Sequence, residues 1–234
     1  MKKVLLISII ALGALMVSCG NKAAQANEEK EEISAQASPE ISAIRIAMNL
    51  AKYGYEAESA SALIEAANIL IANPTQELEA ELEQEKSDAE EMEKAYKVQI
   101  TPAQLLTDAR KFAADDAHLL ALAEDVKAKL NAIPEETRGA VGGPKRAVNH
   151  VYAHGTDYYT IKFWAHELAE ILVSGDGDTD LDIYVYDENG NFITSDADYT
   201  DDCYVRFYPA WTGPFRLKIV NRGGVYNNYV ILTN

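Results

Sequence analysis

Cysteine and positive charge are both scarce in this sequence. Its 234 residues include only 2 cysteines, and 21 Lys and Arg stand against 37 Asp and Glu, for a formal net charge of −16. Such an acidic balance argues against a nucleic-acid groove, which needs a basic surface. The hydrophobic share of 48% is sufficient for a packed core, so we expect packing, and not a disulfide framework, to stabilise the fold.

A hydrophobic run long enough for an ordinary membrane span is also missing. The N-terminal stretch MKKVLLISIIALGALMVSC has two lysines, a short apolar run and small residues before Cys19, which is typical of a secretory signal. Its end, LMVSC, resembles the lipobox of bacterial lipoproteins. The resemblance implies that residues 1–18 are removed and that Cys19 is lipidated, giving an outer membrane lipoprotein of the cell envelope, exposed to the periplasm or at the surface. Simple secretion with cleavage nearby is the alternative, and an intact-mass measurement distinguishes the two.

The next part of the chain divides into a tether and a helical domain. Residues 19–37 are polar and glutamate-rich, which predicts a disordered tether. Residues 38–132 are predicted to be helical. Ser38-Pro39, Asn73-Pro74 and Thr101-Pro102 each place a capping side chain before a proline at the first helical position.

Two segments of the helical domain share one pattern. Residues 38–74 and 101–134 each run from a capped proline through a helix, a polar break and a second helix to Asn and Pro, which predicts two αα-hairpins in a small bundle. The intervening stretch, TQELEAELEQEKSDAEEMEKAYK, has a thin apolar stripe and is predicted to be an acidic helix. Its charged face is either a surface for a cation or partner, or simply solvated.

A change of periodicity marks a second domain. Residues 133–147 are rich in Gly, Pro and charge and predict a linker. Within residues 148–234, six aromatic and β-branched runs alternate with turn residues, which predicts an antiparallel sandwich. The expected fold class is therefore α+β, with an N-terminal helical bundle followed by a C-terminal antiparallel, jelly-roll-like β-sandwich.

The sandwich region resembles the bacterial pre-peptidase C-terminal domain family. The residues that carry the resemblance are Asp180-Leu181-Asp182 and the following turn at Asp187, Asn189 and Gly190, together with Thr212-Gly213-Pro214-Phe215 and the terminal strand around Tyr229. The resemblance implies a jelly-roll-like sandwich related to collagenase collagen-binding domains. Such domains accompany secreted proteases as non-catalytic appendages, and some relatives bind calcium. No protease domain precedes the sandwich in this sequence.

Four aspartates recur at every second residue before the central strand of the sandwich: Asp176, Asp178, Asp180 and Asp182. On an extended strand they share one face about 7 Å apart, where each pair repels by about 0.6 kcal/mol in water. A loop folded over them would need a cation, and calcium suits several oxygen ligands in loose geometry. The sequence thus predicts a possible Ca²⁺ site, and solvated acids at a strand edge are the alternative.

Other side chains that can carry chemistry have simpler interpretations. Tyr204, Tyr208, Trp211 and Tyr226 are candidates for an exposed surface that holds a glycan or a protein, and packing under loops or against the helices is the alternative. Cys203 alternates with apolar residues and is expected to be buried and inert. HELAE, from His166 to Glu170, lacks the second histidine of a zinc protease and is expected in a turn.

These features favour a non-catalytic, lipid-anchored envelope protein. Its sandwich is expected to act as a binding or adhesion module for an extracellular polymer or protein. The alternative function is an accessory or inhibitory partner of a separately encoded secreted peptidase. No catalytic constellation is recognisable in the sequence, so an enzyme is not expected.

Overall fold

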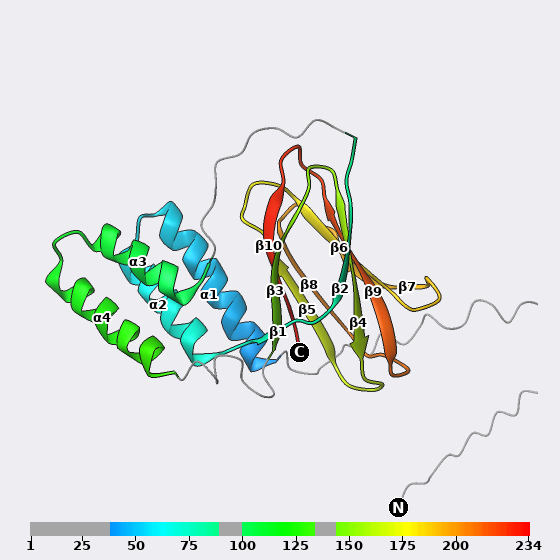
Figure 1. The fold of residues 1–234 in the computed structure, drawn as a ribbon, viewed down its shortest axis with the longest axis horizontal. Coiled ribbons are helices and arrows are strands. Elements are labelled where there is room, and N and C mark those ends of the chain that lie inside the picture. Colours follow the sequence, from blue (N-terminus) through cyan, green and yellow to red (C-terminus); the bar gives the residue numbers. More distant parts are fainter. Residues whose placement is uncertain (1–37, 89–99, 134–143) are drawn as a thin grey trace, which may run out of the picture. The chain divides into compact units, whose positions relative to one another are not determined.

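The α+β fold class is confirmed by a computed structural model, which describes residues 38–88, 100–133 and 144–234 (Figure 1). The signal, Cys19 and the whole of the tether (residues 19–37) lie outside the described residues. The helices are α1 (Pro39–Glu56), α2 (Ala60–Ala72), α3 (Pro102–Ala113) and α4 (Ala117–Ala132). None of them is both long and apolar enough to cross a lipid bilayer.

Side-chain caps start the helices, and two of the three predicted starts are confirmed. The hydroxyls of Ser38 and Thr101 accept hydrogen bonds from the first turns of α1 and α3, each followed by proline. The start predicted at Asn73 is wrong, because Asn73 ends α2: its side-chain amide donates to the carbonyl of Ile69 at 2.8 Å. Pro74 then leads the chain out of the helical layer.

The two predicted αα-hairpins are confirmed as α1–α2 and α3–α4. Their shared core contains small and branched residues, among them Ala51, Leu63, Leu105 and Val126. Alanines at the contacts let the helix axes approach closely, which lets short helices bury a continuous apolar stripe.

The sandwich consists of two five-stranded sheets, with strand orders β1-β3-β10-β5-β8 (sheet A) and β2-β4-β9-β6-β7 (sheet B). The strands are β1 (Gln76–Glu77), β2 (Glu81–Glu85), β3 (Lys145–Val151), β4 (Thr156–Phe163), β5 (Ala169–Ser174), β6 (Leu181–Tyr186), β7 (Phe192–Asp196), β8 (Asp202–Phe207), β9 (Gly213–Asn221) and β10 (Asn227–Thr233). All pairings are antiparallel except β1 with β3. The six predicted strands correspond to β4, β5, β6, β8, β9 and β10.

The predicted acidic helix is wrong for the part of it that the structure describes. Glu81–Glu85 pairs antiparallel with β4, so that Leu82 faces the sandwich core while Glu83 faces out and pairs with Arg216 (Nη2 to Oε2, 2.8 Å). The apolar residues of this stretch fit the spacing of a helix and also the alternation of a strand. It forms a strand because it can pair with the free edge of β4. The predicted linker is also too long, since β3 begins at Lys145, inside it.

The core of the sandwich lies between the inner faces of the two sheets. Alternate residues of each strand point inward, as Leu181, Ile183 and Val185 do on β6, all of them fully buried. Phe163 and Phe207 meet edge to face across the sheets, with ring centroids 5.5 Å apart. The alternation of apolar and polar residues in the sequence directly predicts which side chains face this core.

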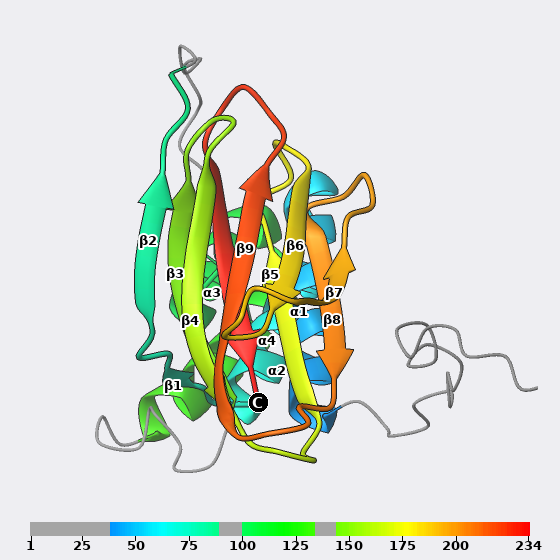
Figure 2. The same ribbon diagram turned by 90° about the vertical axis from the view of Figure 1, so that its right-hand side faces the viewer.

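The outer face of sheet A is buried as well, because α1 packs across it. Ile41, Ile44 and Met48 of α1 form a single cluster with Leu172 of β5 and with Val230 and Leu232 of β10. Every residue of β5 is consequently buried, on both faces of the strand. Figure 1 shows α1 as the helix next to this sheet, and Figure 2 shows sheet B on the side away from the helices.

A buried carboxylate fixes the start of α1 on the sheet. Glu170 on β5 is 1% exposed. It accepts a hydrogen bond from the backbone N–H of Ser38 at 2.8 Å and another from the hydroxyl of Tyr204. Burying this charge without partners would be costly, so the two donors define where the helix begins relative to the strand.

These contacts couple the two predicted domains. Strands β1 and β2 come from the chain between the hairpins, yet they complete sheets A and B. A fragment cut near Gly142-Gly143 would lose both strands and expose the outer face of sheet A. We therefore expect such a fragment to be much less stable than the whole chain.

A matched pair of isoleucines on α1 tests this coupling. Ile44 is 1% exposed and contacts sheet A, whereas Ile46 is 59% exposed. Ile44→Ala should lower the free energy of unfolding of the sandwich by about 2–5 kcal/mol, because it leaves a cavity at the helix–sheet contact. Ile46→Ala should change it by less than about 0.5 kcal/mol. Chemical denaturation followed by near-UV circular dichroism measures both, and equal effects would show that α1 does not stabilise the sheet.

Candidate functional site

The aspartate run does not form the extended strand predicted for it. Residues 175–180 form a loop between β5 and β6, turned by Gly177 at φ +86°, and only Asp182 lies on β6. Asp176, Asp178 and Asp180 therefore do not share a strand face. Asp182 points away from the inter-sheet core as expected, but it is only 4% exposed and is not a solvated acid.

The aspartates have separate partners. Asp182 accepts from the guanidinium of Arg222 (Nε to Oδ2, 2.7 Å) and from the hydroxyl of Tyr184 at 3.0 Å. Asp176 accepts from the backbone and side-chain N–H groups of Asn228 at 3.1 and 2.9 Å. Among the residues that the structure describes, no group of three or more His, Cys, Asp or Glu side chains is arranged to hold a metal ion.

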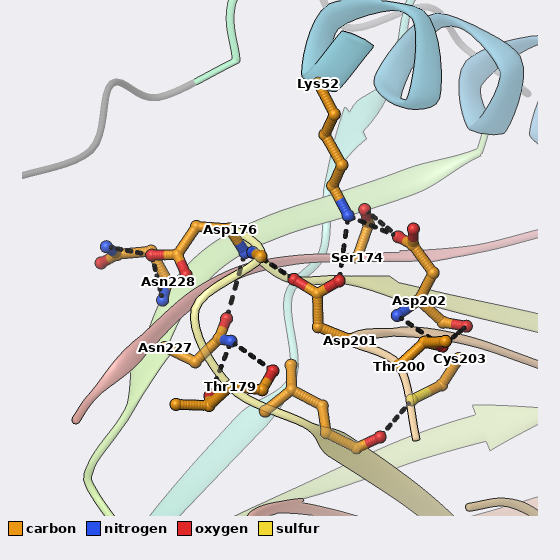
Figure 3. A network of polar contacts seen from close by, with 12 residues as sticks. Lys52, Ser174, Asp176, Thr179, Thr200, Asp201, Asp202, Cys203, Asn227 and Asn228 are labelled. Carbon is orange, nitrogen blue, oxygen red and sulfur yellow. Dashed lines mark hydrogen bonds and ion pairs between the residues drawn. The ribbon is translucent and has the colours of Figure 1, made fainter. Parts of the chain in front are cut away.

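A lysine supplies positive charge beside the loop (Figure 3). Lys52 extends from α1 and pairs with Asp201 at 3.2 Å and with Asp202 at 2.9 Å, both from the start of β8. Asp201 also accepts from the backbone N–H of Gly177, which connects the aspartate loop to the same ion pair. Part of the counter-charge that calcium was expected to provide thus comes from the helical layer.

Asp180 lies in an electrostatically unfavourable position. One of its carboxylate oxygens is buried and has no hydrogen-bond partner among the described residues. Burial raises the pKa of Asp180 above its usual value, and the negative charge of Asp182 raises it further, while Arg222 acts in the opposite direction. The ionised form of Asp180 therefore destabilises the fold at neutral pH.

The four predicted ligand-binding aromatics do not form one surface. Tyr204 lies on β8 against α1, where the guanidinium of Arg45 sits 5.2 Å from its ring centre. Tyr226 lies in the β9–β10 loop and contacts His150. Tyr208 and Trp211 lie in the β8–β9 loop, at the other end of the nine-residue strand β9, roughly 27 Å away. Tyr204 thus packs against the helices, which is the alternative stated for these aromatics.

One end of the sandwich nevertheless gathers exposed aromatic side chains. Trp164 in the β4–β5 loop is 60% exposed, and Tyr208 and Trp211 are 45% and 37% exposed. Their loops are joined by two hydrogen bonds, from Ala165 N to Thr212 Oγ1 at 2.9 Å and from His166 N to the carbonyl of Pro209 at 2.8 Å. We call Trp164, Tyr208 and Trp211 the aromatic end; both loops lie at the lower end of Figure 2.

The two indoles of the aromatic end are held in place by neighbouring side chains. Trp211 stacks on the buried ring of Phe215, with centroids 5.8 Å apart and an interplanar angle of 24°. The ammonium of Lys162 lies 5.2 Å from the ring centre of Trp164. Rings that are exposed but positioned lose little conformational entropy on binding. Trp164 is a site residue that the sequence analysis missed, because it directly follows a clear strand pattern.

The remaining chemical candidates are accounted for by the fold. Cys203 is 1% exposed, donates its thiol to the carbonyl of Leu181 at 3.0 Å, and has a pKa raised chiefly by burial. Such a thiol is inert, as predicted. The HELAE stretch begins in the β4–β5 turn, where His166 has φ +61°, and ends on β5 with the buried Glu170. It does not form a helical metal site.

The comparisons with known proteins find structural likeness only. No protein-family model matches the sequence, and a search of curated proteins gives no match. The solved structures similar to the chain include the pre-peptidase C-terminal domain of collagenase from Bacillus anthracis, at 15% identity and TM-score 0.34, covering 38% of this chain and 88% of that one.

Other similar structures have varied roles. A mitogen from Yersinia pseudotuberculosis has 11% identity and a TM-score of 0.33, covering 40% of this chain and 86% of its own. A family 35 carbohydrate-binding module from Clostridium thermocellum has 12% identity and a TM-score of 0.24, covering 39% and 98%. Scores at this level do not identify a function, so the functional argument depends on the geometry of the chain itself.

The raised pKa of Asp180 gives a pH-dependent prediction. A carboxyl whose pKa is higher in the folded state destabilises that state above its unfolded pKa, and the effect disappears as pH falls below it. Asp180→Asn should therefore raise the melting temperature at pH 7 by about 1–3 °C and have no such effect near pH 3. Asp178→Asn, on an exposed residue of the same loop, is the control.

The same melting curves test calcium, which stays a prediction. If Ca²⁺ binds here, it should stabilise the wild type more than Asp180→Asn. If the melting curves in calcium and in chelator coincide, the aspartates of this loop are neutralised by protein groups and not by calcium. Lower stability of Asp180→Asn at pH 7 would contradict the account of this residue.

Proposed function

We propose that this protein is a non-catalytic binding module of the cell envelope, anchored through a lipid on Cys19, and that its aromatic end holds an extracellular polymer. The observation that supports the proposal is the convergence of Trp164, Tyr208 and Trp211 on two hydrogen-bonded loops. Scattered exposed aromatics are ordinary, but three on adjoining loops form a surface.

The chemistry of this surface suits a polysaccharide chain. Flat, positioned rings offer large contact areas to the apolar faces of sugars, and few rotatable bonds are frozen when they bind. Tyr and Trp are also the side chains that most often dominate binding energy at interfaces. A glycan of the envelope or of the extracellular matrix is therefore the first polymer to test.

A protein partner is the second candidate, and a different feature favours it. β7 is an edge strand of sheet B, and Phe192 and Ile193 on it are 57% and 36% exposed. An open edge with apolar side chains accepts an added strand from a peptide. An accessory or inhibitory role toward a secreted peptidase would use this edge.

The two tryptophans of the chain make the first test direct. The sequence has only Trp164 and Trp211, and both lie in the aromatic end, so intrinsic tryptophan fluorescence reports solely on this surface. We expect a blue shift when oligosaccharides fragmented from envelope or matrix glycans are added to the full chain. Trp164→Ala and Trp211→Ala should each weaken binding at least about tenfold.

Two variants serve as controls. Tyr199→Ala removes a tyrosine that is 98% exposed on another loop and should bind as the wild type does. Phe192→Ala should leave glycan binding intact but reduce capture of a peptidase. Unchanged binding in both tryptophan variants would exclude the aromatic end as the site, and loss only in Phe192→Ala would favour the peptidase partner.

A further inference from the structure

A cavity of about 470 Å³ lies between α1 and the outer face of sheet A, within the 300–1,000 Å³ typical of small-molecule sites. A second cavity, of about 220 Å³, lies on the side of the helical bundle. Both are lined by Met48, Ile100 and Arg146, so the two spaces adjoin at these residues. The aromatic end contributes no described residue to either cavity.

The middle of the larger cavity has apolar walls. Met48 projects from α1, while Val148 on β3 and Val230 on β10 are directly paired across the two strands. All three belong to the cluster that joins α1 to the sheet. Apolar walls around a space of this size favour an apolar ligand over bulk water.

Arg146 places a positive charge at one end of this apolar space. It lies two residues before Val148 on β3 and therefore on the same face of the sheet. Among the residues that the structure describes, its guanidinium donates one hydrogen bond, a long one of 3.4 Å to the carbonyl of Ile100. No carboxylate of the described residues lies within ion-pair distance of it. Burial accordingly lowers the pKa of Arg146 below its usual value.

The other end of the cavity carries negative charge. Asp176, bonded to Asn228, and Glu56 line it here, and the ammonium of Lys52, which also lines it, is already paired with Asp201 and Asp202. Because Asn228 pairs with His150 and not with Arg146, this acidic end lies four residues along β3 from Arg146, roughly 13 Å away. An anionic group is therefore favoured only at the Arg146 end, and the space between the ends is apolar.

We infer that this cavity binds a small amphiphile with one anionic head, a carboxylate or a phosphate ester, and a short apolar body. The head pairs with the guanidinium of Arg146, whose planar N–H groups match either anion in a two-pronged geometry. The body lies between Met48, Val148 and Val230. This site uses none of the residues of the aromatic end, so it can be tested independently of the proposed polymer binding.

Binding of matched ten-carbon probes to the full chain tests the inference. Decanoate, decyl phosphate and decanol share one apolar body and differ in the head; the two anions are kept below their critical micelle concentrations and decanol below its solubility limit. Isothermal titration calorimetry should show one equivalent of decanoate or decyl phosphate bound, and decanol bound at least tenfold more weakly. The stronger of the two anions identifies the head group. Inorganic phosphate, which lacks the body, should not bind measurably.

Variants separate a ligand-binding role of Arg146 from a structural one. Arg146→Met should reduce the preference for anion over alcohol at least tenfold, while the melting temperature without ligand stays the same or rises, since a poorly partnered charge is removed. Arg110→Met, at an exposed arginine paired with Glu124, should keep the preference. Val148→Trp should fill the space and abolish binding of both decanoate and decanol.

Three results would overturn the inference. The first is absence of binding for both anionic probes, and the second is equal affinity for decanoate and decanol. The third is a lower melting temperature for Arg146→Met together with unchanged anion binding, which would make Arg146 a structural residue only. Trp211→Ala should bind decanoate normally, so its result also separates this site from the aromatic end.

Discussion

The packing of α1 across the outer face of sheet A is the contact on which the rest of the structure depends. Leu172, Val230 and Leu232 make that face apolar, and a sheet in water cannot leave it exposed without inviting association. Ile44 and Met48 cover it, which turns a two-layer sandwich into a three-layer domain. The same contact brings Lys52 to the aspartates and leaves the cavity beside Arg146.

The packing of α1 on sheet A also determines which charged side chains meet. The chain has 37 acids against 21 bases, and several cations of the described residues pair with acids. Lys52 pairs with Asp201 and Asp202, and Arg222 pairs with Asp182, so much of the counter-charge for the aspartate region comes from the protein itself. Arg146 departs from the pattern, since it lies beside apolar walls and has one weak acceptor among the described residues. Groups with unmet electrostatic requirements are where binding is expected.

Part of this fold could be predicted because its local signals agree with its tertiary contacts. The strand of Leu181, Ile183 and Val185 alternates in sequence and is buried in the structure. The stretch Glu81–Glu85 could not be predicted, since its apolar residues fit a helix and a strand equally and only the open edge of β4 decides between them. The contact between α1 and sheet A could not be predicted either, because the apolar stripe of a helix does not indicate which surface it packs against.

The candidate site shows the same division. The Asp176–Asp182 run was recognisable as a cluster of acids, but Gly177 turns the chain so that Asp176 and Asp182 bind different partners, which spacing alone cannot reveal. Tyr208 and Trp211 were identified, whereas Trp164 was missed, because hydrogen bonds between two loops bring it beside them. A tryptophan in a turn between two strands was the available signal.

Native-state hydrogen exchange of the full chain tests the central claim most directly. If α1 and sheet A form one cooperative unit, the slowest amides of α1, β5 and β10 should exchange with the same free energy of opening, equal to that of global unfolding. Their exchange should also respond to denaturant with the same slope. Exchange of α1 at a much lower free energy, with β5 and β10 still protected, would show that the sandwich stands without its helical layer and would contradict the account.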